Sequence, residues 1–309
     1  MRIGIDLGGT KIAAGLVDDN YAIVCKAERR TEASRPAGEI VKDIVAVARE
    51  LYDQAGGSVQ SIGMGVPGTI DNQKGTIAYT TNLPFQNEPV VAVLSAACNV
   101  PVFLGNDANA AALGEVYAGA GGGCRSLLMV TLGTGIGGGV IIGGKIHEGF
   151  NGVAGEIGHM SIVYDGRICG CGRPGCFEAY ASASALVAQT QEAMQEHPDS
   201  LMWRASGKID ARTPFIYARE GDAAAQAVVD RYIDYLASGV ANLINILQPE
   251  VVCIGGGVSG EGENLLAPLR ERVNAIEYMR MDPRSRIVRA TLGNDAGIIG
   301  AALLSLSYS

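Results

Sequence analysis

One short segment of the chain gathers residue types that bind metal. It reads GEIGHMSIVYDGRICGCGRPGCFEAY and holds one of the three histidines and three of the seven cysteines. Glycine-rich turns separate Cys169, Cys171 and Cys176, and His159 lies ten residues before the first of them. Three thiolates and one imidazole complete the tetrahedron that zinc prefers and leave no position open for water. The segment 159–176 therefore predicts a structural zinc site.

A disulfide is the alternative interpretation of these cysteines. Cys169 and Cys171 flank a single residue, which is poor geometry for a mutual bridge, and the total of seven cysteines is odd. Met1 is followed at once by the strand-like RIGID, a start that does not resemble a signal peptide. We therefore expect a cytoplasmic protein, in which thiols stay reduced and remain available to metal. The scattered cysteines are expected to fill the core: Cys25, Cys98, Cys124 and Cys253.

The amino-acid composition and net charge of the chain limit the classes of molecule that it is expected to bind. The net charge of −8 argues against nucleic acid, whose phosphates attract clustered lysine and arginine. No apolar run approaches the roughly 20 residues that cross a bilayer, so we expect no membrane span. The 43 glycines occur in bunches, which usually indicates backbone brought close to a ligand.

The elements that must position these residues alternate between strand and helix. RIGIDLGGTKIAAGLVD predicts strands at 2–6 and 12–18 around a glycine turn, and SLLMVTLGTGIGGGVIIGG repeats this plan at 126–144. The repetition indicates an internal duplication with one hairpin from each half facing a common cleft, although a chance match of two glycine hairpins would look the same. Further strands are expected in SIGMGVP, PVFLG and EVVCIGGG, and helices near 38–55, 90–97, from 107 onward, 222–247, 263–276 and 296–306. This alternation predicts α/β lobes in a chain of 309 residues.

Three glycine turns at strand ends could bind phosphate. DLGGTK is not a Walker P-loop, yet it offers the Gly8 and Gly9 amides, the Thr10 hydroxyl and the Lys11 ammonium to an anion. Asp6 could hold Mg²⁺ through water, since hard cations prefer oxygen ligands. Two further turns offer amides at Gly133, Thr134 and Gly135, and at Gly256 and Gly257. Together they indicate a ligand that carries phosphate and is held with Mg²⁺, and the last turn, which follows a strand and precedes a helix, could contact adenosine.

The motifs resemble those of the ROK family of sugar kinases, within the actin–hexokinase superfamily. DLGGTK is similar to its first phosphate motif and LGTGIGGG to its second, while EIGH, nine residues and CGCGRPGCFE match the family signature at each fixed position. The resemblance implies an α/β, two-lobed actin-like ATPase (ribonuclease H-like) fold with duplicated lobes and an inter-lobe cleft. The expected lobes are residues 1–117 plus about 295–309, and residues 118–294.

The resemblance also implies roles for single residues. Asp107, in GNDANAA, would be the catalytic base that accepts the proton of the sugar hydroxyl. The expected sugar ligands are Gly68, Asn82, Asn106 and Asp107, with Glu156, His159 and Glu178 as a wall ordered by the zinc. Without the family context, Asp107 would be read as a helix N-terminal acid and Glu178 as an ordinary solvated glutamate.

The favoured function is ATP-dependent phosphorylation of glucose to glucose 6-phosphate. N-acetylmannosamine, N-acetylglucosamine, fructose and mannose are alternative acceptors, and polyphosphate is an alternative donor. Repressors of this family carry a helix-turn-helix module ahead of DLGGT, and here that motif starts at Asp6. A sugar-responsive regulator without catalysis is therefore the less favoured reading. Like other members of the family, the protein is expected to form a homodimer or homotetramer.

Overall fold

The computed structural model describes residues 1–205, 207–279 and 282–308, which cluster into two units. Unit 1 comprises Met1–Met129, Gly139–Gly155 and Ala290–Ser309, and unit 2 comprises Val130–Gly138 and Glu156–Arg289. These bounds differ from the expected lobes, since residues 118–129, 139–155 and 290–294 belong to unit 1. One physical reason is that the Glu115 carboxylate accepts hydrogen bonds from the N–H groups of Ala120, Thr291 and Leu292.

Unit 1 is built on a sheet with the strand order β3-β2-β1-β4-β8. The strands are β1 (Arg2–Leu7), β2 (Lys11–Val17), β3 (Ile23–Arg30), β4 (Ile62–Val66) and β8 (Val102–Asn106). The first three are antiparallel, whereas β1, β4 and β8 run parallel. Parallel strands end at the same edge of a sheet, so Asp6, near the end of β1, and the residue that follows β8 are brought to one edge.

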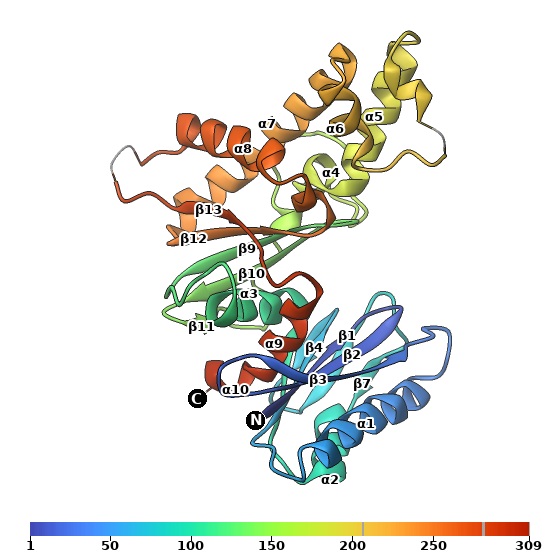
Figure 1. The fold of residues 1–309 in the computed structure, drawn as a ribbon, viewed down its shortest axis with the longest axis vertical. Coiled ribbons are helices and arrows are strands. Elements are labelled where there is room, and N and C mark those ends of the chain that lie inside the picture. Colours follow the sequence, from blue (N-terminus) through green and yellow to red (C-terminus); the bar gives the residue numbers. More distant parts are fainter. Residues whose placement is uncertain (206, 280–281, 309) are drawn as a thin grey trace. The chain divides into compact units, whose positions relative to one another are not determined.

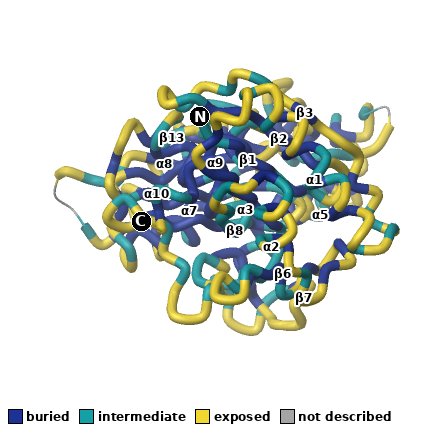
Figure 2. Tube along the Cα trace, turned by 90° about the horizontal axis from the view of Figure 1, so that it is seen from below, coloured by how far each residue is buried: buried dark blue, intermediate teal, exposed yellow. Residues whose placement is uncertain are grey.

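The two faces of this sheet carry different helices (Figure 1). On one face lie α1 (Ala37–Gln54) and α2 (Val90–Cys98), whose buried residues, such as Ile40, Ile44 and Leu94, share one hydrophobic core with Ile3, Ile5 and Leu7 of β1. The other face carries α3 (Asp107–Ala118), α9 (Ala296–Ala302) and α10 (Leu304–Ser307). Figure 2 shows the trace at β1 as buried and many of the surrounding loops as exposed. A small sheet of β5 (Thr69–Asp71), β6 (Thr76–Tyr79) and β7 (Gln86–Glu88) completes unit 1.

Helix α9 lies directly on the backbone of its neighbours. A Cβ atom at Gly4 or Gly63 would lie 1.8 Å from the carbonyl oxygen of Ile298 or Ala301, respectively. A Cβ at Gly300 would lie 1.6 Å from the carbonyl oxygen of Ala110 in α3. Glycines therefore let α9 pack against β1, β4 and α3 without intervening side chains. The expected helix at 296–306 is divided at Leu303 into α9 and α10.

The second sheet has the order β11-β10-β9-β12-β13. Its strands are β9 (Leu127–Leu132), β10 (Ile136–Ile142), β11 (Lys145–Ile146), β12 (Val251–Gly255) and β13 (Arg286–Arg289). Counted along the chain, both sheets have the same order of third, second, first, fourth and fifth strand. This shared order confirms the duplication expected from the two glycine hairpins.

The remaining helices of unit 2 pack mostly against one another, around the longest of them. They are α4 (Glu178–Ala181), α5 (Ala183–Glu196), α6 (Thr213–Arg219), α7 (Ala223–Leu247) and α8 (Glu263–Ile276), with the short 3₁₀ helices η1 (Ile157–His159), η2 (Leu201–Arg204) and η3 (Gly257–Glu261). A fourth 3₁₀ helix, η4 (Gly293–Asp295), precedes α9 in unit 1. Helix α7 begins where expected because the Asp222 side chain caps it, accepting a hydrogen bond from the Ala225 N–H. No helix within the described residues is long and apolar enough to cross a membrane.

Candidate active site and metal centre

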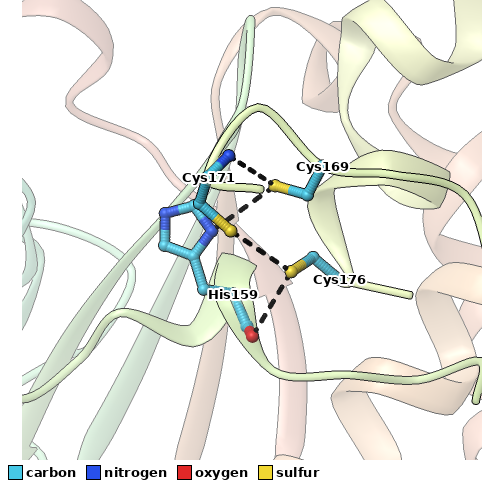
Figure 3. Close-up of side chains that lie close together, drawn as sticks. All are labelled: His159, Cys169, Cys171 and Cys176. Atoms are coloured by element: carbon cyan, nitrogen blue, oxygen red, sulfur yellow. Dashed lines mark hydrogen bonds between the residues drawn. The ribbon is translucent and has the colours of Figure 1, made fainter. Parts of the chain in front are cut away.

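Four side chains of unit 2 converge on one point (Figure 3). His159 ends η1, and Cys169, Cys171 and Cys176 follow in the glycine-rich loop; their candidate ligand atoms all lie within 4.8 Å of one another. The Cys171 and Cys176 sulfurs are 3.7 Å apart, far more than the roughly 2.05 Å of a disulfide bond. All seven cysteines lie within the described residues, and none of them forms a disulfide bond. The disulfide alternative is therefore wrong for this cluster.

The charges of the cluster fit a zinc ion. Burial raises the pKa of the Cys169 thiol to about 12 and also raises the pKa of Cys176. The Arg173 N–H, by contrast, lowers the pKa of the exposed Cys171 thiol. The two buried sulfurs can ionise at neutral pH when a cation compensates their charge, as zinc does for its thiolate ligands. With three cysteines and one histidine converging, the donor set fits a structural zinc with four protein ligands.

Two glutamates flank this cluster. His159 Nδ1 lies 3.7 Å from Glu178 Oε1, and His159 Nε2 lies 4.0 Å from Glu156 Oε2. The Nδ1 atom of the His159 ring therefore faces the cluster and lies 3.7 Å from the Cys169 sulfur. The Nε2 atom faces Glu156. The structure thus brings together the three residues expected to form the sugar-binding wall. Glu178 is the more buried of the two carboxylates, with its side chain 22% exposed against 67% for Glu156.

The edge of the first sheet holds two carboxylates close together. Asp107 is the first residue of α3, and Asn106 caps this helix by accepting hydrogen bonds from the Ala108 and Asn109 N–H groups at 2.9 and 3.2 Å. Burial, followed by the negative charge of Asp107, raises the pKa of Asp6 to about 6, while Lys11 acts in the opposite direction. A cation would relieve this repulsion, so Asp6 and its surroundings fit the expected Mg²⁺.

The glycine turns use part of their backbone internally. The Gly8 N–H donates to the Lys11 carbonyl at 2.9 Å, and the Gly133 N–H donates to the Gly135 carbonyl at 3.0 Å. Lys11 forms an exposed ion pair with Glu28 at 3.4 Å. The remaining expected phosphate-binding residues of these two turns are Gly9, Thr10 and Thr134.

The glycine at position 256, in the third turn, is explained by its backbone conformation and by packing. Gly256 has a φ of 80°, and a Cβ there would lie 2.4 Å from the Leu132 carbonyl oxygen. Gly257 then begins η3. The conformation and the close approach to β9 both require glycine at 256.

Two expected sugar ligands lie elsewhere in unit 1. Gly68 precedes β5, where a Cβ would lie 2.3 Å from the Tyr79 carbonyl oxygen, so close packing explains this glycine. Asn82 is exposed in the loop between β6 and β7, which a hydrogen bond from the Thr80 hydroxyl to the Leu83 carbonyl closes at 2.7 Å.

Sequence reasoning missed two residues that position this edge. The Glu115 carboxylate is fully buried at the end of α3 and holds the segment that leads into α9. A Cβ at Gly297 would lie 2.7 Å from Asp6 Oδ2, so glycine there leaves room for that carboxylate. A charged residue within the apolar ALGEVYAG was the available signal for Glu115. Nothing in the sequence pointed to Gly297.

The family model described as "ROK family" matches residues 2–307, and the chain belongs to this family. Its fold is that of the actin-like ATPases, as in the solved ROK kinases.

The comparisons then identify individual relatives. The chain is 40% identical to a glucokinase of Thermotoga maritima, over 97% of this chain and 95% of that protein. The structure of a ROK family glucokinase from Streptomyces griseus in complex with glucose and AMPPNP superimposes with a TM-score of 0.79, at 37% identity over 98% of both chains. A xylose repressor of Caldicellulosiruptor bescii is 31% identical over 99% of this chain and 78% of its own length.

Proposed function

We propose that this protein is an ATP-dependent hexokinase that phosphorylates glucose to glucose 6-phosphate. The observation that carries the proposal is the carboxylate pair Asp6 and Asp107 at one edge of the first sheet, in a chain 40% identical to a glucokinase. Phosphoryl transfer depends on orienting the attacking hydroxyl and stabilising charge on the phosphate, and two differently placed carboxylates serve these two tasks.

Asp107 is the residue that receives the proton of the sugar hydroxyl. As the first residue of α3 it is held by the helix cap at Asn106, which fixes its backbone direction. The cap engages Asn106 Oδ1, so its Nδ2 is the group that donates to a neighbouring sugar hydroxyl. Gly68 and Asn82 are further sugar-binding residues of unit 1, and Glu156, His159 and Glu178 are those of unit 2.

The phosphate groups are bound by the glycine turns. In unit 1, Gly9, Thr10 and Lys11 bind phosphate in the turn that the Gly8 N–H closes, and Asp6 holds Mg²⁺ through water. In unit 2, the binding residues are Gly133, Thr134, Gly135, Gly256 and Gly257. Bound Mg²⁺ would neutralise the charge that develops on the transferred phosphate. The zinc would have no part in the transfer and would order Glu156, His159 and Glu178.

The test is release of ADP over a panel of hexoses, repeated with polyphosphate as donor. We expect glucose with ATP to give the highest kcat/KM. Asp107→Asn should keep glucose affinity, measured by calorimetry, and lose roughly 10²–10⁴-fold in turnover. Asp199→Asn, which makes the same change at an exposed position, is the control. If Asp107→Asn retained more than a tenth of the turnover at saturating glucose, Asp107 would not be the base.

A sugar-responsive regulator is the second candidate, and the similarity to a xylose repressor is the observation that favours it. It would bind a sugar without releasing ADP from ATP in the same panel. If the best acceptor were N-acetylmannosamine, N-acetylglucosamine, fructose or mannose, the protein would still be a kinase, but its substrate would differ from the one proposed.

We further propose a cytoplasmic homodimer or homotetramer. The seven cysteines, none of which forms a disulfide bond, support a reducing compartment. Light scattering at several protein concentrations tests the oligomeric state, and a monomer throughout would overturn it.

A further inference from the structure

The two oxygens of Glu178 face different parts of unit 2. Oε1 lies 3.0 Å from the Cys169 sulfur and 3.7 Å from His159 Nδ1, so it faces the metal-binding cluster. Oε2 accepts a hydrogen bond from the Ile136 N–H at 3.4 Å, in the turn between β9 and β10. One carboxylate therefore joins the metal-binding segment to the second glycine turn.

The neighbouring glycine of this turn is shaped by the same carboxylate. A Cβ at Gly135 would lie 2.5 Å from Glu178 Oε2, a distance that Cβ atoms do not adopt. At Gly133, two residues earlier, the nearest atom to a Cβ is the Gly135 oxygen at 4.0 Å. A side chain at 135 would therefore have to displace the Glu178 carboxylate, whereas position 133 has room for one.

Two further contacts hold the turn from the same segment. A Cβ at Gly158, next to the metal ligand His159, would lie 2.3 Å from the Ile136 carbonyl oxygen, so η1 packs directly on the turn. The Ala183 N–H, five residues after Glu178, donates to the Gly133 carbonyl at 2.8 Å. The turn is therefore held before, at and after the cysteine-rich loop.

We propose that the metal-binding segment is a scaffold that holds the turn Gly133–Ile136 in place. Glu178 is the positioning residue, because its carboxylate contacts both the segment and the turn. The inference rests on the proposed function, because it takes nucleotide phosphate as the ligand of that turn. It adds a second role to a segment whose expected role was binding sugar. Disturbing the segment should therefore weaken ATP binding even when no sugar is present.

The experiment measures the dissociation constant of ATP with Mg²⁺ by calorimetry, without sugar, so that loss of a sugar ligand is not sensed. Glu178→Ala and Gly135→Ala should each weaken ATP binding severalfold, since the coupling between residues in contact corresponds to roughly 2–150-fold in an equilibrium constant. The double variant should be much less weakened than the product of the two, because removing the carboxylate makes room for the new Cβ. Glu178→Ser, which also removes the carboxylate from this space, serves if Glu178→Ala does not fold.

Gly133→Ala is the matched comparison. Its Cβ does not meet Glu178, so its effect on ATP affinity should multiply with that of Glu178→Ala. Treating the wild-type protein with a zinc chelator should also weaken ATP binding. Elemental analysis would follow the loss of the metal.

The outcomes separate the two proposals. Failure of the wild-type protein to bind ATP would overturn the proposed function. Normal ATP binding by the wild type together with unchanged affinity in Glu178→Ala, or with independent effects of Glu178→Ala and Gly135→Ala, would overturn the scaffold and leave the kinase intact.

Discussion

Replacing Asp6 by asparagine should stabilise the unliganded protein, and increasingly so as the pH rises. The pKa of Asp6 is raised from 3.8 to about 6, first by burial and then by the charge of Asp107. Because the folded state holds this proton more tightly than the unfolded state, the free energy of unfolding falls as the pH rises between these two values. The neutral amide of the Asp6→Asn variant would carry no charge to desolvate and would escape this loss.

The size of the effect follows from the two pKa values. Their difference corresponds to about 3 kcal/mol at neutral pH, and the linkage relation gives about 0.5 kcal/mol near pH 4. Asp6 keeps some contact with solvent, so about 3 kcal/mol is an upper limit.

The assay is thermal unfolding of the two proteins between pH 4 and 7.5, in buffer without Mg²⁺ or nucleotide, so that Mg²⁺ does not bind Asp6 and the zinc is kept. The unfolding temperature of Asp6→Asn should exceed that of the wild type by an amount that grows with pH and levels off above pH 7. Asp199→Asn, at an exposed site, should show a much smaller pH-dependent difference. A constant difference between Asp6→Asn and wild type across this range would refute the reasoning, because it would mean that the Asp6 proton is held equally in both states.

Two further changes test the metal loop and α3. Elemental analysis should find one zinc per chain, and the Cys171→Ser variant should lose it. The KM of this variant for the sugar should rise, because Glu156 and Glu178 would have to be ordered on binding. Normal zinc content in this variant would refute the ligand set. Glu115→Gln should lower the free energy of unfolding by about 1–3 kcal/mol, because the amide has a single acceptor oxygen, whereas the two oxygens of the buried carboxylate accept hydrogen bonds from Ala120, Thr291 and Leu292. Urea denaturation measures this loss, and an unchanged midpoint would show that those contacts contribute little.

Much of the fold could be predicted from local sequence. The periodic apolar residues of α1 and α7 and the glycine hairpins predicted elements that the structure contains within a few residues. The four zinc ligands could be named as well, because ligand types at close spacing along a glycine-rich loop are restricted to a small volume by the chain itself. The short strands β5, β6 and β7 were missed, since three or four residues carry too little periodicity to be recognised.

The limits of the units depended on contacts far apart in the sequence. Glu115 ties residues 291 and 292 to the end of α3, a hydrogen-bonding partnership across more than 170 positions that leaves no local pattern. For the same reason, the expected boundaries near 117 and 295 differ from those of the structure.

The sequence by itself determined which residue types were available for chemistry: a set of zinc ligands, three glycine turns, and an acid at the start of a helix. The tertiary structure decided which neighbouring atoms occupy the space beside particular glycines, both inside and outside those turns. Gly135 leaves room for the Glu178 carboxylate, Gly297 leaves room for Asp6, and Gly300 lets α9 touch α3. A glycine in a sequence shows that a side chain is absent. The atom that occupies the space belongs to a distant part of the chain, and only packing in three dimensions brings it there.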